Sequence, residues 1–344
     1  MKILINHDPN KPVHTTDWTT GWESFCKKHS IEYEIIDLMQ VNAIETLKNF
    51  DVVLWHFGNY SYEEMLEARS ILMAASTLGV KVFPNHNEAW HFDDKVAEMY
   101  ALQAVHAPMP KSQVFYNMKN LKQAVVNGEI EFPIVAKLRT GSGSHNVKLI
   151  RNKRKLFNYA KRMFGKGFKP APSILYKTSS NIRSSHDWQT FKAKVKRIPE
   201  FLRTLAGACK FPREKGYVYL QEFIPNDNFD IKVVVLGDKC TGFHRPVRSH
   251  DFRASGGGGF IDDTSVFTEQ IVKSAFATAE ALGMRCVGFD YVIDKRTGLG
   301  KIIEMSYGCG HDISGSGGYY TRDFKWVPQP ITLEEEIIRF MLKK

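Results

Sequence analysis

The N-terminal quarter of the chain alternates between short apolar runs and helical patterns. Four runs have the length and composition of strands: 2–8, 33–37, 51–57 and 80–83. Three segments between them have apolar residues at helical spacing: 17–29, 41–49 and 61–78. Such alternation builds a parallel sheet, because each helix returns the chain to the same end of the sheet. The sequence therefore predicts a small α/β unit, and no GxGxxG dinucleotide fingerprint follows its first strand.

Polar side chains follow two of these predicted strands. His7 and Asp8 come after the first strand, and His56 and Asn59 come after the third. Open parallel sheets bind ligands beyond the carboxyl ends of their strands, so all four are candidate binding residues. The alternative is that they cap helices and fill loops, as polar residues at such positions commonly do.

The 344 residues exceed one ordinary domain core and predict two or three domains. With 43% hydrophobic and 24% charged residues, the composition is that of a folded globular protein rather than a disordered chain. No apolar run approaches the roughly 18–20 residues of a membrane-spanning helix, and the first residues show no signal-peptide core. The five cysteines are widely spread without zinc-site spacing, so we expect reduced thiols in a cytoplasmic enzyme.

Positive charge is concentrated in one stretch of the chain. Residues 151–215 hold 18 lysines and arginines against three acids, a net charge of +15; the whole chain carries +10, so the remainder carries −5. Helical patterns at 152–164 and 187–207 flank a Pro/Ser-rich break, which predicts a basic helical insertion. An anionic partner such as a phosphate, carboxylate, acidic glycan or nucleic acid would suit this charge. A solvated helical face is the alternative.

The other patterns predict a second fold that is rich in hairpins. Strand-forming runs lie at 132–138, 217–224, 232–247, 287–294 and 301–306. The run 232–247 is predicted to turn back on itself at Gly237 and Asp238, and the last two runs are joined by a short turn. Helices are predicted at 93–105, at 266–282 and in the acid-first, lysine-last segment at the C-terminus.

Two carboxylates stand within the last predicted hairpin. Asp290 lies in GFDYV and Glu304 lies in KIIEM, so the two can converge on one face of the sheet. Burying two carboxylates together is costly unless a cation lies between them, and carboxylate oxygens suit Mg²⁺, particularly with substrate phosphates in its shell. The alternative is that each carboxylate pairs with a basic residue.

Two glycine-rich loops have basic neighbours. Lys137 precedes the loop Gly141-Ser142-Gly143, whose backbone N–H groups can surround phosphate oxygens, and Lys95 offers a second positive charge. The second loop contains four consecutive glycines, and three arginines flank it: Arg245, Arg248 and Arg253. These arginines form a candidate anion site. Taken alone, each loop is equally compatible with an ordinary surface loop.

The order of these elements resembles that of the ATP-grasp superfamily. Along the chain it runs DK, PIVAK-x₃-GSG, QEFI, DIKVVV, R-x₇-R with glycines, GFD and IEMS. The chain looks most like the branch that holds the ribosomal-protein glutamate ligases, and glutathione synthetase and D-alanine–D-alanine ligase are more distant. The similarity covers about 84–310, interrupted by the basic stretch. The joint order carries the resemblance, because none of the motifs is specific alone.

This resemblance implies an α/β (α+β) protein with four segments. A Rossmann-like pre-ATP-grasp domain would occupy 1–84, and the first ATP-grasp subdomain would occupy 85–150. The basic helical insertion would follow at 151–215, and the C-terminal subdomain, with the metal site and a tail helix, would occupy 216–344.

The resemblance also implies roles for individual residues. Those expected to bind ATP are Lys95, Lys137, Gly141, Ser142, Gly143, Glu222, Ile224, Asp230 and Lys232. Those expected to be catalytic are Arg245 and Arg253. Those expected to hold Mg²⁺ are Asp290, Glu304 and Ser306. The two lysines would hold the phosphates, the glycine loop would close over them, and the backbone of the QEFI segment would read the adenine.

Three positions depart from the family pattern. Ser306 and Ser255 stand where the family usually has asparagine, and Lys232 stands where arginine is frequent. A carbonyl oxygen is a commoner Mg²⁺ ligand than a serine hydroxyl, so the sequence leaves open whether one or two ions bind.

The implied reaction is that of an ATP- and Mg²⁺-dependent, ADP-forming ligase that joins a carboxylate to an amine through an acyl phosphate. Segment 307–326 resembles ATP-grasp proteins of surface-polysaccharide synthesis, which favours a sugar uronic acid or another anionic glycan as the carboxylate. Ligation of an amino acid to a peptide or protein is an alternative, as is a kinase that phosphorylates a small polyol. A nucleic-acid-binding module is disfavoured, because the basic stretch has no recognised motif. The sequence does not fix the oligomeric state, for which a dimer is one expectation.

Overall fold

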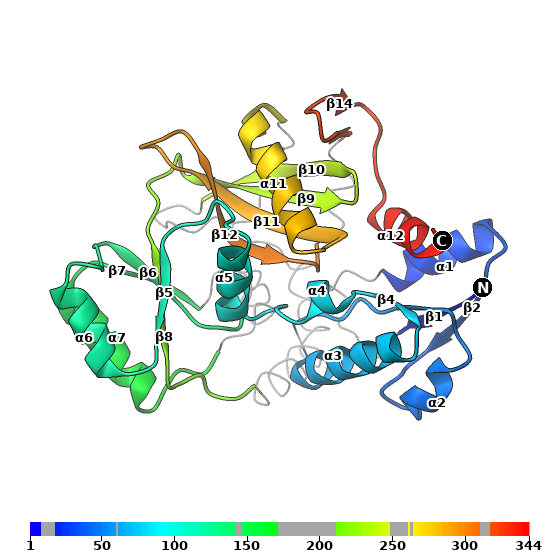
Figure 1. Ribbon diagram of the computed structural model, residues 1–344, viewed down its shortest axis with the longest axis horizontal. Helices are drawn as coiled ribbons and strands as arrows, with labels where there is room; N and C mark the ends of the chain where they lie inside the picture. Colours follow the sequence, from blue (N-terminus) through cyan, green and yellow to red (C-terminus); the bar gives the residue numbers. More distant parts are fainter. Residues whose placement is uncertain are drawn as a thin grey trace, which may run out of the picture.

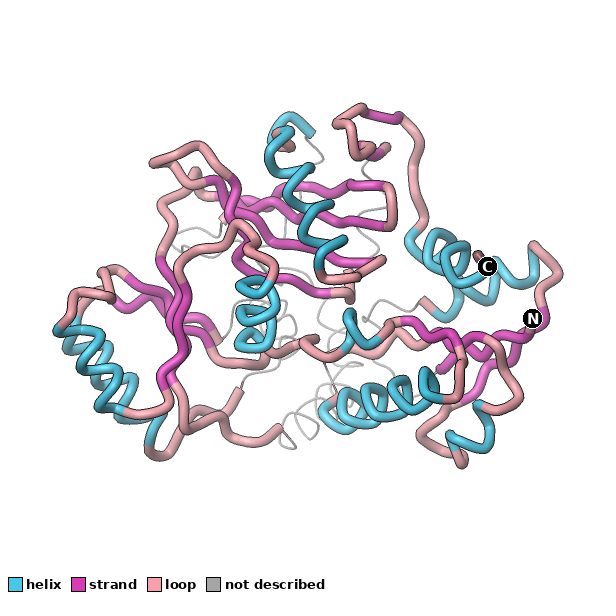
Figure 2. The backbone as a smooth tube through the Cα atoms, in the orientation of Figure 1, coloured by secondary structure: helices cyan, strands magenta, loops and turns pink. Residues whose placement is uncertain are grey.

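The computed structural model describes residues 1–7, 18–59, 61–141, 146–170, 211–247, 261, 264–309 and 317–343. Three sheets and the helices that cover them make up this part of the chain (Figures 1 and 2). The N-terminal unit lies at the right of Figure 1, and the other two sheets lie at its left and upper centre. The expected mixed α/β class is confirmed.

The first sheet is parallel, as the alternating sequence pattern predicts, with the strand order β2-β1-β3-β4. Its strands are β1 (Lys2–Asn6), β2 (Glu32–Ile36), β3 (Val52–Leu54) and β4 (Lys81–Phe83). The helices of this unit are α1 (Thr19–Lys28), α2 (Ala43–Leu47) and α3 (Tyr62–Thr77). The apolar residues of β1 and β3 are fully buried beneath these helices, which explains why both runs are almost entirely aliphatic.

The second sheet is antiparallel, with the order β5-β8-β6-β7. Its strands are β5 (Ser112–Phe115), β6 (Ile134–Lys137), β7 (Val147–Ile150) and β8 (Val218–Glu222). The helices α6 (Met118–Val126) and α7 (Lys153–Phe164) pack on it and enclose a separate hydrophobic core. Strand β8 follows the basic stretch in sequence, yet it lies between β5 and β6.

The third sheet is also antiparallel, with the order β12-β11-β9-β10-β13-β14. Its strands are β9 (Phe229–Leu236), β10 (Lys239–Pro246), β11 (Cys286–Ile293), β12 (Gly300–Ser306), β13 (Tyr319–Tyr320) and β14 (Trp326–Val327). The short η1 (Thr264–Val266) precedes α11 (Glu269–Ala281), which covers one face of this sheet. The β9–β10 hairpin turns at Gly237 and Asp238, as predicted.

One helix contacts both hydrophobic cores, and the C-terminal helix packs on the N-terminal unit. After the short α4 (His86–Ala89), helix α5 (Lys95–Ala104) packs Val96 and Met99 into the core of the second sheet. The same helix packs Ala101 and Leu102 into the core shared by the other two sheets. The C-terminal helix α12 (Leu333–Leu342) lies beside α1 on the N-terminal unit (Figure 1).

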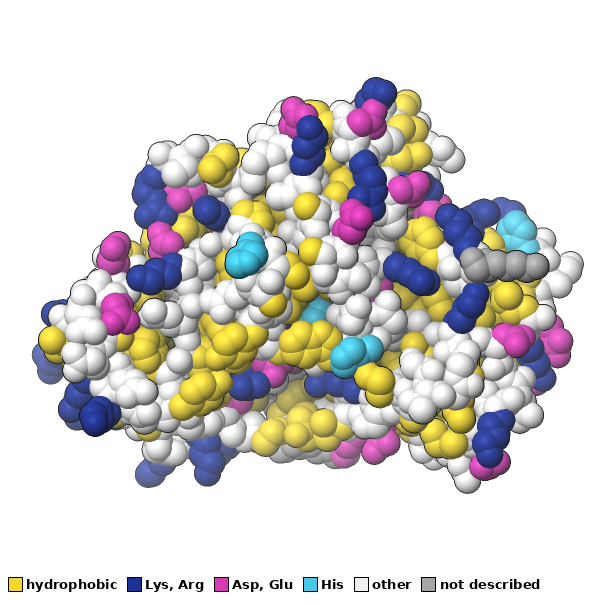
Figure 3. Space-filling model, in the orientation of Figure 1, with side chains coloured by type: hydrophobic (Ala, Val, Ile, Leu, Met, Phe, Trp, Pro, Cys, Tyr) yellow, Lys and Arg dark blue, Asp and Glu magenta, His cyan; other side chains and the backbone are white. Residues whose placement is uncertain are grey.

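The described part of the basic stretch begins with α7. Its apolar residues face the second sheet, and its lysines and arginines are exposed. This segment therefore fits the alternative of a solvated helical face. The predicted helix at 187–207 lies outside the described residues. On the face drawn in Figure 3, lysine and arginine side chains are spread widely, and hydrophobic side chains gather across the middle. None of the described helices is long and apolar enough to cross a membrane.

Candidate active site

The two candidate metal carboxylates lie side by side. Strands β11 and β12 are antiparallel neighbours, and their register places Asp290 directly opposite Glu304. This confirms the sequence prediction that the hairpin brings the two residues together. Because side chains alternate between the faces of a strand, Ser306 shares the face of Glu304. The three candidate metal ligands therefore occupy one face of the hairpin.

Asp290 is paired with cations from β9 and β10 of the same sheet. The Nζ of Lys232 forms an ion pair with Oδ1 of Asp290, and the Nη2 of Arg245 lies 3.1 Å from its Oδ2. Arg245 also donates two hydrogen bonds of 2.7 Å each to the carboxylate of Asp230. Burial disfavours the charged form of Asp290, but Lys232 and Arg245 outweigh it and lower the pKa of Asp290 to about 2. Asp290 is therefore ionised at every physiological pH.

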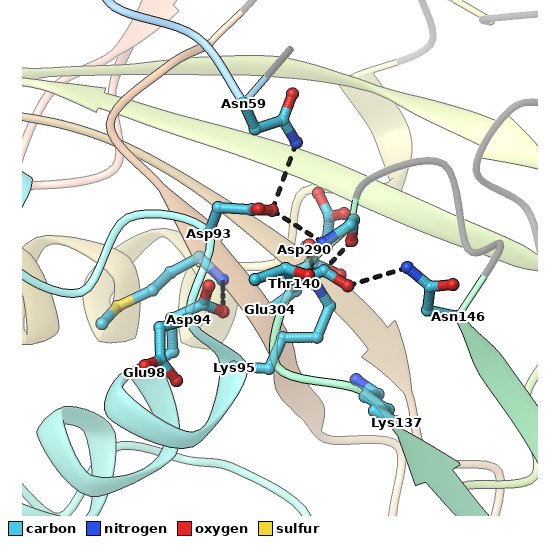
Figure 4. Close-up of polar contacts among 12 residues, drawn as sticks. Asn59, Asp93, Asp94, Lys95, Glu98, Lys137, Thr140, Asn146, Asp290 and Glu304 are labelled. Carbon is cyan, nitrogen blue, oxygen red and sulfur yellow. Dashed lines mark hydrogen bonds and ion pairs between the residues drawn. The ribbon is translucent and has the colours of Figure 1, made fainter. Parts of the chain in front are cut away.

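Glu304 is paired with Lys95, which begins helix α5. The Nζ of Lys95 lies 3.2 Å from Oε1 of Glu304 and donates a 2.7 Å hydrogen bond to the carbonyl of Gly141 in the glycine loop. Lys95 is only 4% exposed. Burial alone would lower its pKa, but nearby carboxylates, Glu304 first, raise the pKa above its ordinary value. Lys95 is therefore a buried permanent cation between the loop and the hairpin (Figure 4).

Lys137, the last residue of β6, reaches the same place from the second sheet. Its Nζ donates a 2.8 Å hydrogen bond to the carbonyl of Ile303, next to Glu304. It is 5% exposed. Burial lowers the pKa of Lys137 to about 8, and the positive charge of Lys95 adds to this effect, while Glu304 opposes it. Lys137 is mostly protonated at neutral pH and can lose its charge in mildly alkaline solution.

Sequence reasoning missed Glu98 and assigned no role to Asp93 and Asp94. Asp94 caps α5 by accepting hydrogen bonds from the N–H groups of Val96 and Ala97, and it forms a 2.6 Å ion pair with Arg139. Glu98 lies one helical turn after Lys95, and its Oε2 accepts a 3.3 Å hydrogen bond from the N–H of Met305. The three-residue spacing from Lys95 was a usable signal, because residues at i and i+3 share a helix face.

Burial has a strong effect on the pKa values of Glu98 and Asp93. It raises the pKa of Glu98 to about 8, against the lowering effect of Lys95. It also raises the pKa of Asp93 to about 6, although Lys95, Asn59 and the N–H of Gly141 favour the charged form. Asn59 donates a 3.2 Å hydrogen bond to Asp93, so this candidate residue from the N-terminal unit reaches the loop region (Figure 4).

The predicted site residues on β8, in the segment after it and at the end of β12 make hydrogen bonds of their own. Glu222, at the end of β8, accepts a 2.7 Å hydrogen bond from Arg296 and a 3.3 Å one from the N–H of Lys111. Ile224 is buried, and its carbonyl accepts a hydrogen bond from the side chain of Asn226. The Ser306 hydroxyl accepts a 3.1 Å hydrogen bond from the N–H of Gly308. These predicted residues lie outside the described part: Asp8, Ser142, Gly143, Arg248, Arg253 and Ser255.

His56 and His7, the two candidate histidines of the N-terminal unit, differ in their contacts. His56 stacks on Trp18, with ring centroids 4.1 Å apart, and Tyr307 lies edge-on to the same imidazole. The backbone N–H of His7 donates to the carbonyl of Ile36. His56 therefore packs among aromatic side chains of the core.

The carboxylate pair is a suitable donor set for one hard cation. The sequence allowed either a Mg²⁺ site or pairing of each carboxylate with a basic residue. The structure shows the pairing: Glu304 pairs with Lys95, and Asp290 pairs with Lys232 and Arg245. The same two carboxylates stay close enough together to bind a metal ion. Within the described residues, no group of three or more His, Cys, Asp or Glu could hold a metal ion. Mg²⁺ keeps several waters and is commonly bound by one or two carboxylates plus substrate phosphates, so two carboxylates suffice. Phosphates and Mg²⁺ arriving together could exchange partners with these ion pairs without leaving a buried charge unpaired.

Comparisons with known proteins identify the fold. No protein-family model matches the chain, and no curated protein is significantly similar to it in sequence. The structure of the RimK domain protein ATP-grasp from Sphaerobacter thermophilus matches over 100% of both chains, with 15% identity and a TM-score of 0.55. D-alanine–D-alanine ligase from Bacillus anthracis complexed with ATP matches 99% of this chain and 97% of its own, with 14% identity and a TM-score of 0.58. ATP-grasp ligase PsnB complexed with minimal precursor matches 99% of each chain, with 12% identity and a TM-score of 0.56. The chain therefore has the ATP-grasp fold.

Proposed function

We propose that this protein is an ATP- and Mg²⁺-dependent ligase that joins a carboxylate to an amine and releases ADP. One observation carries the proposal: two buried lysines from different elements reach strand β12 directly beside Asp290, where Lys95 pairs with Glu304 and Lys137 donates to the adjacent carbonyl of Ile303. Buried cations next to paired carboxylates match the charge pattern of a bound nucleotide triphosphate and its metal ion. The ATP-grasp fold, and the ligases among its solved structures, support this interpretation.

The residues divide into binding roles as follows. Lys95 and Lys137 would hold the phosphates of ATP, with the loop at 141–143 closing over them. Segment 222–224 would hold the adenine, and Asp230 and Lys232 would complete the nucleotide site. Asp290 and Glu304 would hold Mg²⁺, with Ser306 as a further oxygen ligand. Bound Mg²⁺ would offset the negative charge of the phosphates.

The proposed chemistry has two steps. A carboxylate oxygen of the acceptor attacks the γ-phosphorus of ATP, and the bond from that phosphorus to the bridging oxygen breaks, giving an acyl phosphate and ADP. The amine then attacks the acyl carbon, loses a proton and expels phosphate, which leaves an amide. Positioned cations supply most of the catalysis in such transfers, and Arg245 and Arg253 are our candidates for that role. Arg245 is held for it by Asp230 and Asp290.

For the acceptor we propose an anionic sugar acid, with a uronic acid as the leading candidate. Two sequence features support this class: the +15 stretch at 151–215 and the resemblance of segment 307–326 to proteins of surface-polysaccharide synthesis. A peptide or protein carboxylate is the second class to test. The amine partner is the least constrained part of the proposal.

A screen for amine-dependent ADP release tests the proposal. The purified protein is incubated with MgATP and a panel of uronic acids, their nucleotide-linked forms and acidic peptides, each crossed with ammonia and amino acids. We expect ADP and phosphate only when a carboxylate and an amine are both present. A stable phosphorylated acceptor formed without amine would instead show a kinase. Glu304→Gln is the matched control, because it keeps the shape of the side chain and removes its charge.

A further inference from the structure

The stem of the glycine loop is held by two buried carboxylates. Three successive residues follow β6 and Leu138, and each donates its backbone N–H to an acid. Arg139 shares its N–H between Oε2 of Glu214, at 2.8 Å, and the hydroxyl of Tyr217, at 2.7 Å, and Thr140 donates to Oε1 of Glu214 at 2.9 Å. Gly141 donates to Oδ1 of Asp93 at 3.0 Å. The Thr140 hydroxyl also donates to Oε1 of Glu214, at 2.5 Å.

Both carboxylates are themselves fixed in place. Glu214 exchanges two backbone hydrogen bonds with Phe168, of 2.9 and 2.8 Å, and its carboxylate accepts a further bond from the Tyr217 hydroxyl. Asp93 is held by Asn59. Neither carboxylate is accessible, since each residue is 8% exposed. The stem is therefore anchored to groups that cannot move freely.

Backbone carbonyls of the same stem are also engaged. The carbonyl of Gly141 accepts from Lys95, and the carbonyl of Thr140 accepts a 2.9 Å bond from the side chain of Asn146 (Figure 4). Lys95 thereby connects the stem to Glu304 and the hairpin. Any shift of residues 139–141 would move the lysine contact that the proposed nucleotide site depends on.

Successive backbone N–H groups can bind anions. Here the protein's own carboxylates accept these N–H groups, Glu214 from residues 139 and 140 and Asp93 from Gly141. The N–H groups of residues 139–141 are consequently committed to the protein, which leaves Lys95 and Lys137 as the described groups for phosphate contacts. Glu214 lies between Arg213 and Lys215 in the sequence, but its carboxylate accepts hydrogen bonds from the loop. Arg213 instead donates to the carbonyl of Lys166.

We propose that Glu214 is a positioning residue for the phosphate-binding loop, with Asp93 completing the clamp. This inference rests on the proposed function, because it assigns a role within the same nucleotide site. Its specific consequence is selective: disturbing the clamp weakens contacts to the outer phosphates and leaves the adenosine part of the nucleotide bound as before.

The test compares ATP, ADP and AMP binding by isothermal titration calorimetry in the presence of Mg²⁺. In E214Q, an NH₂ group replaces one acceptor oxygen and faces an N–H donor. We expect the Kd for ATP and ADP to rise about tenfold or more, as loss of a charge-assisted hydrogen bond predicts, and the Kd for AMP to stay within about twofold. T140V, which removes only the hydroxyl contact, should show the same selectivity with a smaller rise, and T140S should restore tight binding.

Glu88→Gln is the matched control. Glu88 is also a buried carboxylate that accepts backbone N–H groups, from Asn85, Arg285 and Cys286, but it lies away from the loop. We expect E88Q to lower thermal stability without changing the ratio of ATP to AMP affinity.

The outcomes separate the clamp from the proposed function. Equal weakening of ATP and AMP in E214Q, or unchanged ATP binding in a folded E214Q, overturns the clamp alone. If the unaltered protein fails to bind ATP, the proposed function falls and the clamp falls with it. If E214Q does not fold, T140V and T140S decide the question by the same comparison.

Discussion

Replacing Lys137 by methionine should weaken ATP binding in a pH-dependent manner. Methionine has a similar length and no charge, so the variant removes one phosphate counter-charge with little change of volume. A charge-assisted hydrogen bond to phosphate is worth about 1.5–3 kcal/mol, which corresponds to a rise in the Kd for ATP of roughly 10- to 150-fold at pH 7. At this pH about 90% of Lys137 carries its proton, given its pKa of about 8.

The pH dependence follows from the same pKa. Above pH 8, Lys137 of the free protein is increasingly neutral, and ATP binding must then be accompanied by proton uptake. The Kd of the unaltered protein should rise by up to about tenfold for each pH unit between 8 and 10. K137M has no such group, so its Kd should not show this rise, and the two curves should converge near pH 10.

A stability measurement separates lost affinity from lost structure. Burial lowers the pKa of Lys137, so its charged form destabilises the fold below pH 8, and stability increases as pH rises through that value. K137M removes this cost and should be at least as stable as the parent at pH 7, by up to roughly 3 kcal/mol. The assay is isothermal titration calorimetry at pH 6 to 10 with parallel thermal melts. Parallel Kd curves for the two proteins would refute the assignment of Lys137 as a phosphate ligand.

Three further predictions follow from the site. Glu304→Gln should reduce ADP release at least about 100-fold in a protein that still folds, with a lower melting temperature because the buried Lys95 loses its nearest charged partner; near-normal turnover would remove Glu304 from the metal site. Between pH 4 and pH 7, Asp93→Asn should become more stable relative to the parent protein by roughly 2–3 kcal/mol. The reason is that burial raises the pKa of Asp93 to about 6, so ionising this acid destabilises the parent protein. Equal pH profiles of unfolding free energy, measured by chemical denaturation, would contradict this. Reversing four charges of the basic stretch should raise the KM of the anionic acceptor and reduce the salt dependence of that KM, while the kinetic parameters for ATP stay unchanged. Identical acceptor kinetics in the two proteins would mean that the stretch is a solvated face. The four residues, outside the described part, are Lys192, Lys194, Lys196 and Arg197.

Much of the fold was predictable because it depends on local patterns. The parallel N-terminal sheet follows from alternating apolar runs, and the β11–β12 hairpin follows from two such runs joined by a tight turn. That hairpin fixes the register of Asp290 and Glu304, so their proximity could be inferred from sequence spacing alone. The short strand β5 was not predicted, because SQVF has only two apolar residues and the second sheet pairs it with a strand more than 100 residues later. Helix α6 was not predicted either, although its N-cap Asn117 and its buried residues Leu121, Ala124 and Val125 give a helical pattern.

The parts of the site that escaped prediction depend on long-range contacts. Glu214 meets the glycine loop across about 75 residues, and nothing in the surrounding run of basic residues distinguishes its carboxylate. The pairing of Lys232 and Arg245 with Asp290 arises from strand order in the third sheet, which the sequence does not state. Likewise, the C-terminal helix α12 packs against α1 near the start of the chain. The amphipathic pattern of α12 predicts a helix but does not predict which element the helix packs against.

The most direct test of the central claim is an oxygen-isotope transfer experiment. The acceptor found in the screen is labelled with ¹⁸O in both carboxylate oxygens, and the reaction with MgATP and amine is analysed by mass spectrometry of the released phosphate. If the carboxylate is activated as an acyl phosphate, one ¹⁸O atom must pass to phosphate when the amine displaces it, and the amide must keep the other. Unlabelled phosphate would contradict the account, whether the missing ¹⁸O atom is found in water or AMP or both ¹⁸O atoms stay in a carboxylate that has not formed an amide.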